Sequence, residues 1–210
     1  MSEALTFYTN PMSRGQIVRW ALEESGAAYK TVIVEYGADM KAPDYLAINP
    51  MGKVPAIRHN GRVVTECAAI CAYLAEALPE AGLAPAADER AAYYRWMFFA
   101  AGPLEQAVTV RAMDWTTEED RSAMLGFGSY DDAVGAVEAL LNAGDHVCGS
   151  RFTMADVYVG SHIEWGLEFG TLPKRPAFEA YAGRIAGRAA HKRARGIDAA
   201  LIAERQAAGS

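Results

Sequence analysis

Glu66 and Cys67 stand at the start of a predicted helix that runs to Leu78, with Thr65 as its expected N-cap. The free amides and positive end of such a helix suit a carboxylate. The side chain of Glu66, in the same first turn, can accept hydrogen bonds from an ammonium group. Together these residues predict a site for the free head of an amino acid. Complementation of the helix dipole is the simpler role for Glu66.

A second candidate segment precedes this helix, in the sequence Asn49-Pro-Met-Gly-Lys-Val-Pro55. A proline that opens a strand cannot donate to a sheet, so Pro55 belongs at an edge or in an unusual conformation. A cis bond between Val54 and Pro55 would turn the Val54 amide and carbonyl outward, toward an extended peptide lying beside them. The frequency of cis bonds favours the alternative, an ordinary trans turn proline.

The histidines and cysteines form no metal-binding or disulfide pattern. Metal-ligand spacing is missing among His59, His146, His162, His191, Cys67, Cys71 and Cys148. The three cysteines also lack a C-x-x-C pair. We therefore expect no metal site, free thiols and a reducing, cytoplasmic compartment.

Composition and charge exclude several classes of protein. The 210 residues carry a formal net charge of −6, which argues against a dedicated nucleic-acid binder. The longest apolar run, Ala68 to Ala75, is far shorter than the roughly 20 residues of a membrane helix. The basic cluster of Lys192, Arg193 and Arg195 is expected to form a solvated helix face that offsets an acidic segment, 81–170.

The first 80 residues alternate between strand and helix patterns. In order they predict strand, helix, strand, helix, strand, strand and helix, with a hairpin at Asn60-Gly61. The expected segments are Leu5–Tyr8, Ser13–Gly26, Tyr29–Val34, Asp44–Ile48, Val54–Ile57, Arg62–Val64 and Glu66–Leu78. Leu78–Pro85, which contains two prolines and a glycine, is the expected linker.

The residues beyond the linker predict helices only. Their helical pattern runs from 88 to 205 with several glycine-containing breaks, and at Pro103 it resumes so soon that a kink is expected. The predicted fold is therefore an α/β domain over 1–80 followed by an all-helical domain over 86–210.

With these elements in place, the sequence resembles the glutathione S-transferase superfamily over nearly its whole length. The resemblance rests on Asn49-Pro-x-Gly-Lys-Val-Pro55, Thr65-Glu-Cys67 and Phe152-Thr-Met-Ala-Asp156. It implies a thioredoxin-like glutathione domain, a cis Val54–Pro55 bond and a structural role for Pro55. Thr153 and Asp156 fit a capping box, so Asp156 is expected to serve folding rather than catalysis.

The resemblance also implies a set of glutathione contacts. Glu66 and Cys67 would hold the γ-glutamyl end of glutathione, and Val54 would pair with its cysteinyl backbone. Lys53 and Lys41 lie where family members approach the glycyl carboxylate. The family usually has serine where this chain has Cys67. A thiol is a weaker hydrogen-bond donor than a hydroxyl, which predicts a looser grip on glutathione.

Ser13 is the first choice for the residue that handles the glutathione thiol, because serine- and cysteine-type family members place this residue after the first strand. A hydroxyl at a helix N-terminus can donate to the sulfur and stabilise the thiolate. Ser13 and Gln16 also fit a capping box, in which the hydroxyl would serve only its own helix. Asn10, Arg14 and Tyr8 are the alternatives. No cysteine falls in this turn, which disfavours a cysteine-based thiol-disulfide exchanger.

The expected function is a cytoplasmic glutathione transferase, in which the bound thiolate attacks a hydrophobic electrophile without a metal or resident cofactor. Ordinary core packing is the alternative for the residues that would line the acceptor pocket. These residues are Met12, Tyr93, Trp96, Met97 and Trp115. The implied partners are glutathione as cosubstrate, a small electrophile and a second copy of the chain, with no nucleic acid or membrane. Alternatives are a glutathione-dependent isomerase, dehalogenase or peroxidase, and a non-catalytic ligand-binding protein of the same fold.

Overall fold

The computed structural model describes residues 5–115 and 119–208, whose contacts divide the chain into two compact units. The N-terminal unit comprises Met1–Leu83 together with Gly187–Ser210, and the helical unit comprises Ala84–Ala186. The boundary at Leu83 falls within the predicted linker. The last helix makes its contacts in the N-terminal unit, so the helical region predicted for 86–210 is shared between the two units.

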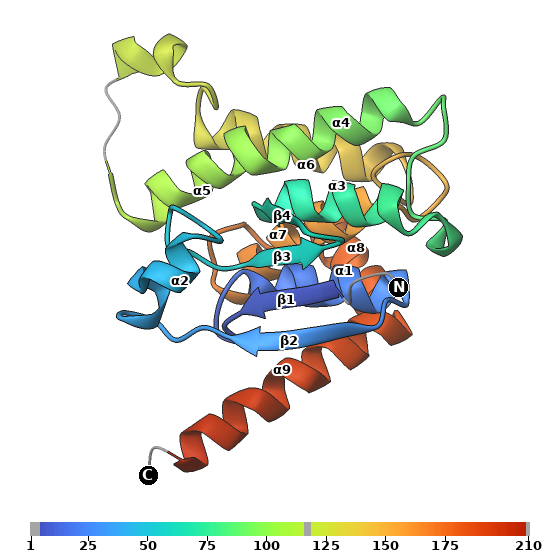
Figure 1. Ribbon diagram of the computed structural model, residues 1–210. Coiled ribbons are helices and arrows are strands. Elements are labelled where there is room, and N and C mark those ends of the chain that lie inside the picture. Colours follow the sequence, from blue (N-terminus) through green and yellow to red (C-terminus); the bar gives the residue numbers. More distant parts are fainter. Residues whose placement is uncertain (1–4, 116–118, 209–210) are drawn as a thin grey trace. The chain divides into compact units, whose positions relative to one another are not determined.

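Within the described residues, the N-terminal unit is built on a four-stranded mixed sheet with the order β2-β1-β3-β4 (Figure 1). The strands are β1 (Leu5–Thr9), β2 (Tyr29–Ile33), β3 (Ala56–His59) and β4 (Arg62–Thr65). β1 runs parallel to β2 and antiparallel to β3. β3 and β4 form the predicted hairpin, in which Asn60 and Gly61 have φ of 50° and 74°, as a type I′ turn requires. The predicted thioredoxin-like arrangement is confirmed.

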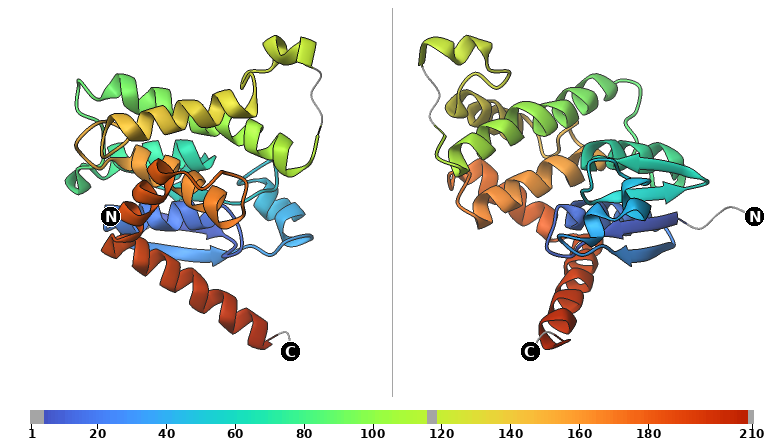
Figure 2. Two further views of the ribbon diagram at one scale, coloured as in Figure 1. Left: turned by 180° about the vertical axis from the view of Figure 1, so that it is seen from behind. Right: turned by 60° about the vertical axis from the view of Figure 1, so that its left-hand side comes forward.

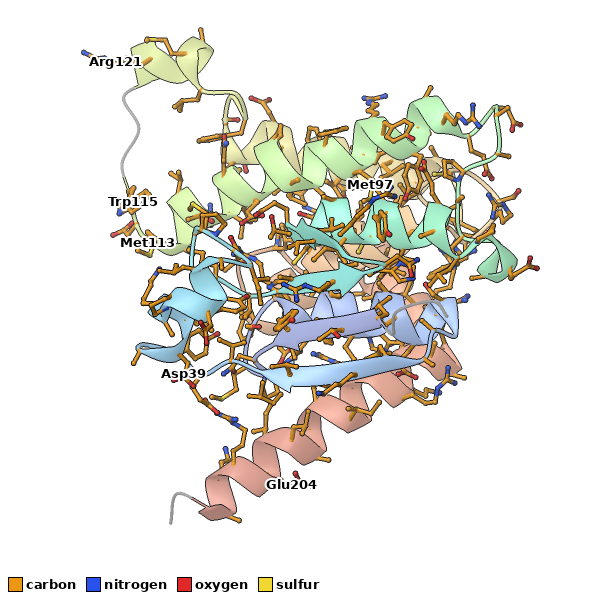
Figure 3. All side chains as sticks on the ribbon, viewed as in Figure 1. Asp39, Met97, Met113, Trp115, Arg121 and Glu204 are labelled. Carbon is orange, nitrogen blue, oxygen red and sulfur yellow. The ribbon has the colours of Figure 1, made fainter. Side chains whose placement is uncertain are left out.

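Helices of the same unit pack on one another and on this sheet. They are α1 (Gly15–Ser25), α2 (Pro43–Leu46), α3 (Cys67–Ala77) and α9 (Ala189–Ala208). α1 contacts both α3 and α9, and its apolar side chains Ile17 and Leu22 join Phe7, Ile57 and Ile70 in a buried core. Figures 1 and 2 show the C-terminal part of α9 projecting past the sheet, where Figure 3 labels Glu204.

The start of α3 differs from the prediction by one residue. Thr65 is the last residue of β4, where it pairs with Ala56, so it is not the N-cap of the helix. Pairing in the sheet keeps Thr65 extended, and Glu66 therefore makes the turn into the helix. Glu66 has φ 66° and ψ 122°, and no side chain caps the first amides of α3.

The helical unit opens with one continuous helical path. α4 (Arg90–Phe99) leads into a π-helical turn, Ala100–Leu104, and then into α5 (Glu105–Ala112). Pro103 lies inside this turn, where the altered hydrogen-bond spacing accommodates its missing N–H. The prediction that the helix continues past Pro103 is confirmed.

The remaining helices of this unit are α6 (Tyr130–Ala143), α7 (Met154–Glu168) and α8 (Pro176–Ala186). α7 is buried along most of its length and begins with the predicted capping box of Thr153 and Asp156. None of the helices in the described ranges is long and apolar enough to cross a lipid bilayer.

Asp156 is fully buried, and both of its carboxylate oxygens are used by the fold. Oδ2 accepts from the backbone N–H of Thr153 at 2.8 Å and from its hydroxyl at 3.2 Å. Oδ1 accepts from the N–H of Val147 and the hydroxyl of Tyr181, each at 2.8 Å. Burial and this carboxylate raise the pKa of Tyr181 well above its ordinary value. These contacts support the folding role expected for Asp156.

The basic cluster near the C-terminus contacts α1 of its own unit. Nε of Arg193 donates to Glu23 at 3.1 Å, and Nη1 of Arg195 donates to Oε1 of Gln16 at 2.7 Å. The prediction of a solvated face that offsets 81–170 is therefore wrong for these two arginines, because their partners lie on α1.

Candidate functional site

The turn between β1 and α1, residues 10–14, carries three of the four candidates for handling a thiol. Asn10 is fully buried, and backbone groups occupy both ends of its amide. Nδ2 donates to the carbonyl of Val34 at 3.2 Å, and Oδ1 accepts from the N–H of Met12 at 3.1 Å. These contacts favour a turn-forming role for Asn10 over a thiol-binding one.

Ser13 is half-buried, and its hydroxyl lies between two backbone groups. Oγ donates to the carbonyl of Asn10 at 2.6 Å and accepts from the N–H of Gly15, the first residue of α1, at 2.9 Å. Gln16 does not complete the expected capping box, because its Nε2 donates to the carbonyl of Pro11 at 2.7 Å. The Ser13 hydroxyl therefore receives a helix amide and holds a proton that can be redirected from a carbonyl to an anion.

Gly15 is required by a close approach between β1 and α1. A Cβ at this position would lie 1.9 Å from Oγ1 of Thr9 and 3.0 Å from Oγ of Ser13. Only glycine lets the first turn of α1 come this near to the end of β1, and this approach brings the helix amides to Ser13.

Arg14 and Tyr8 have contrasting surroundings. Arg14 is exposed and occupies the N-cap position of α1. Tyr8 is half-buried on β1, where it packs against a cluster of Val34, Met40 and Tyr45. Tyr8 is therefore held by packing, whereas Arg14 is accessible to solvent at the turn.

The loop before β3 is held together through its carbonyl oxygens. The carbonyl of Lys53 accepts from Nδ2 of the buried Asn49 at 2.8 Å and from the hydroxyl of Tyr45 at 2.7 Å. Burial raises the pKa of Tyr45 to about 12, so its phenol stays protonated at neutral pH. Nζ of Lys41 donates to the carbonyl of Met51 at 2.9 Å. The structure thus brings Lys41 to the loop that carries Lys53.

The bond between Val54 and Pro55 is cis, as predicted. Val54 is half-buried and precedes the residues of β3 that pair with their neighbours, so its backbone lies outside the described ladder. Gly52 has φ 57°, and a Cβ there would lie 2.5 Å from the carbonyl oxygen of Met40. The loop can therefore turn back toward Met40 only with glycine at this position.

Glu66 and the first turn of α3 form an uncompensated pair of charges. The side chain of Glu66 is exposed, and among the described residues its carboxylate has no hydrogen-bond or ion-pair partner. The first turn of α3 contains no acidic side chain and no side-chain cap. A carboxylate at these amides and an ammonium at Glu66 would satisfy both, as the sequence predicts.

Cys67 links the start of α3 to the start of α1. It is 9% exposed, and its Sγ donates to the carbonyl of Arg14 at 3.5 Å. This contact joins residues 53 positions apart in the sequence. The candidate head-group site and the turn that carries Ser13 are therefore neighbours within one unit.

The candidates for the acceptor pocket fall into two groups. Tyr93, Trp96 and Met97 are 1%, 7% and 3% exposed, as expected of core residues. Met12 and Trp115 are 57% and 59% exposed. Trp115, labelled beyond the end of α5 in Figure 3, lines a hollow of about 850 Å³ in the helical unit. Its other lining residues include Val110, Arg111, Phe127 and Tyr130.

Sequence reasoning missed several residues that build the site. Gln16 was considered only as a cap, and no role was expected for Tyr45. Tyr36, whose hydroxyl donates to the carbonyl of Met12 at 3.1 Å, was also missed. Their partners lie between 5 and 179 positions away, where local patterns give no signal. Asn49 could have been found, because it stands inside the motif that identified the loop.

Comparisons with known proteins agree with this geometry. Residues 12–77 match the family described as Glutathione S-transferase, N-terminal domain. The protein named Glutathione S-transferase GstA of Escherichia coli O157:H7 is 30% identical over 149 residues, which span 69% of this chain and 73% of that protein. A maleylacetoacetate isomerase of Pseudomonas aeruginosa is 28% identical over 162 residues, 73% of this chain and 76% of that protein.

A solved structure has the same fold with its ligand in place. It is a glutathione transferase homolog from Sulfitobacter with bound glutathione, 28% identical, with a TM-score of 0.73 over 92% of this chain and 97% of that one. These similarities support glutathione transferase activity, and the isomerase shows a second activity among the relatives. From the sequence identity, the family match and the shared fold, this chain belongs to the glutathione S-transferase superfamily.

Proposed function

We propose that this chain conjugates the thiolate of glutathione to a hydrophobic electrophile. The observation that carries the proposal is the contact from Sγ of Cys67 to the carbonyl of Arg14, which joins the uncapped start of α3 to the turn bearing Ser13. It supports one continuous glutathione site in the N-terminal unit, with the amino-acid head at α3 and the thiol beside Ser13.

The γ-glutamyl end binds at the start of α3. Its carboxylate receives hydrogen bonds from the free amides of the helix, and its ammonium binds the exposed carboxylate of Glu66. Cys67 already donates to Arg14, so the carboxylate depends mainly on backbone amides. This explains how the site tolerates a thiol where the family usually has a hydroxyl.

The rest of the tripeptide lies along the loop before β3. The backbone of Val54, outside the described ladder, pairs with the cysteinyl residue. Lys53 is exposed and binds the glycyl carboxylate, whereas Lys41 uses its ammonium to hold the loop carbonyls. Lys41 therefore acts on the ligand indirectly, by shaping the loop that carries Lys53.

Ser13 stabilises the thiolate by turning its hydroxyl proton from the carbonyl of Asn10 to the sulfur. Lowering the thiol pKa by about two units requires about 2.7 kcal/mol of preference for the anion. A hydrogen bond to a charged acceptor supplies roughly 1.5–3 kcal/mol, and the nearby N-terminus of α1 adds to it. The thiolate then forms a sulfur–carbon bond with the electrophile, whose leaving group departs with its electron pair.

The acceptor is apolar and contacts exposed hydrophobic side chains. Met12 lies in the turn that bears Ser13, and Trp115 lines the hollow of the helical unit. Tyr93, Trp96 and Met97 support this region as packed core.

The protein forms a homodimer in a reducing, cytoplasmic compartment. Exposed apolar side chains on each unit support a contact between copies, and they include Met51, Val63, Tyr94 and Phe98. The three cysteines are free, as a reducing compartment requires. Light scattering at micromolar concentration should give the mass of a dimer, and a monomeric mass would refute the dimer.

A second candidate is a glutathione-dependent isomerase, favoured by the similarity to the Pseudomonas maleylacetoacetate isomerase. The same thiolate would add to a conjugated double bond, allow rotation and leave again unchanged. The two activities differ in their products, because conjugation consumes glutathione and isomerisation returns it.

The test is glutathione binding by calorimetry followed by assays on a panel of small electrophiles and of cis-alkenoic keto acids. Consumption of glutathione with an apolar electrophile supports the transferase. Turnover of the keto acids with glutathione regenerated supports the isomerase. Binding without turnover on either panel would favour a ligand-binding protein and contradict the proposal.

A further inference from the structure

The side-chain amide of Gln16 connects α9 to the turn that bears Ser13. Its Oε1 accepts from Nη1 of Arg195 at 2.7 Å, and its Nε2 donates to the carbonyl of Pro11 at 2.7 Å. The guanidinium can only donate and the carbonyl can only accept, so these partners fix which way the amide points. A side chain held at both ends in this way transmits the position of one partner to the other.

Pro11 depends on this contact more than its neighbours do. Proline has no N–H, so the carbonyl is the one backbone group through which Pro11 can be tied. The neighbouring carbonyls are held by other groups, that of Asn10 by Ser13 and that of Met12 by Tyr36. Pro11 shares a peptide plane with the Asn10 carbonyl that accepts from Ser13. Fixing Pro11 therefore fixes the acceptor that orients the Ser13 hydroxyl.

α9 is anchored firmly enough on α1 to serve as a support. Asp198, one turn after Arg195, accepts from Nε of Arg19 at 2.7 Å, and the two side chains are 4% and 1% exposed. Nearer the start of α9, Arg188 binds both carboxylate oxygens of Glu24 at 2.6 and 2.8 Å. These contacts set the position of α9 along α1, and with it the position of Arg195.

We propose that Gln16 and Arg195 are positioning residues, through which the C-terminal helix α9 holds the Ser13 hydroxyl in the orientation that serves the glutathione thiol. The inference rests on the proposed function, since it gives Ser13 a thiol to act on. Gln16 and Arg195 do not touch the substrate in this account. Their effect passes through the carbonyl of Pro11 and the turn.

The test uses the full chain with glutathione bound and measures the pKa of the bound thiol by ultraviolet titration of the thiolate. Gln16→Met and Arg195→Met should each raise that pKa by about half a unit to one unit, the range of coupling expected for a residue acting through one neighbour. Conjugation at neutral pH should fall about 3- to 10-fold, and glutathione affinity should stay within about 2-fold. Arg195→Lys should restore part of the loss.

Arg193→Met is the matched control. Arg193 lies two residues away on α9 and contacts Glu23, near the end of α1 far from the turn, so its removal should leave the thiol pKa unchanged. An equal shift in this control would show a general effect of loosening α9 and would overturn the relay. Melting temperatures confirm that each variant is folded, and Arg195→Met keeps the test open if Gln16→Met is not.

A Ser13→Ala background separates this inference from the proposed function. If the relay acts through Ser13, then adding Gln16→Met to Ser13→Ala should cause no further change in the thiol pKa. Additive shifts would overturn the relay. A change with Ser13→Ala but none with Gln16→Met or Arg195→Met would overturn the relay and leave the proposed function standing. Absence of glutathione binding, or an unchanged thiol in Ser13→Ala, would overturn the proposed role of Ser13 and the relay with it.

Discussion

Two helices of this protein begin with the same type of sequence, Ser13-x-x-Gln16 before α1 and Thr153-x-x-Asp156 before α7. At α7 the two side chains satisfy each other's backbone in a buried capping box. At α1 the hydroxyl still accepts a helix amide, but the Gln16 amide turns to Pro11 and Arg195.

The difference lies in what remains available once the helix has begun. All the described contacts of Asp156 belong to the fold, and no solvent reaches its carboxylate. Ser13 is half-buried and gives its proton to a carbonyl, from which an anion can take it. The same motif thus stabilises one unit and equips the other for chemistry, and the following predictions test this contrast.

The largest effect is expected from Asp156→Ala. It would leave the buried donors of Thr153, Val147 and Tyr181 without their acceptor, at a cost of about 3 kcal/mol or more in the free energy of unfolding. Urea unfolding measures this loss. The control is Asp132→Ala at the exposed cap of α6, which should cost about 1 kcal/mol or less. Equal losses at the two caps would contradict the buried role of Asp156.

The next effect concerns ligand binding at the exposed carboxylate of Glu66. Glu66→Ala should weaken glutathione binding by about 1.5–3 kcal/mol, the scale of a hydrogen bond to a charged group, while stability changes little. Calorimetry measures the dissociation constant. Glu80→Ala removes an equivalent exposed charge beyond the end of α3 and should leave it unaltered. An unchanged dissociation constant in Glu66→Ala would rule out the head-group assignment.

Ser13→Ala should reverse the pattern seen at Asp156, with a loss of activity larger than the loss of stability. Conjugation at neutral pH should fall about 10- to 100-fold, or about 1.4–2.7 kcal/mol, because the thiol pKa rises toward its solution value. Loss of the acceptor for the Gly15 amide costs about 1 kcal/mol of stability. Ser25→Ala, at the other end of α1, controls for the general removal of a hydroxyl. A folded, glutathione-saturated Ser13→Ala protein with full activity would reduce Ser13 to a cap.

The smallest effect is a pH dependence at the edge of the helical unit. The hydrogen bond from Arg151 holds the pKa of Glu89 below its ordinary value. A lowered folded-state pKa contributes stability above the unfolded value, and that stability is lost as the pH falls through the folded value. Arg151 is 40% exposed, so solvent screening keeps the contribution under about 1 kcal/mol. Glu89→Gln should flatten the acid limb of stability against pH, and an unaltered limb would show that the pair contributes nothing.

Local sequence was enough to predict the elements of the N-terminal unit and several features of its site. The hairpin depends on the Asn60-Gly61 dipeptide, and the capping box of α7 depends on residues three apart. The cis Val54–Pro55 bond was predicted only through a family resemblance, because nothing in the residues themselves outweighs the usual preference for trans.

The contacts that complete the site depend on residues far apart in the chain. Arg195 and Gln16 are 179 positions apart, and Cys67 and Arg14 are 53 apart, so only the folded chain brings them together. The position of α9 was missed for the same reason, since its helical pattern does not specify which unit it packs on. Propensity and periodicity describe an element, whereas its partners are decided by tertiary packing.

The central claim is that the turn at Ser13 ionises the thiol of bound glutathione, and titration of the thiolate absorbance in the unaltered glutathione complex tests it most directly. We predict a thiol pKa about two units below the solution value of about 8.5 or above, so that most bound glutathione is thiolate at neutral pH. A bound thiol that titrates at its solution value would contradict the account.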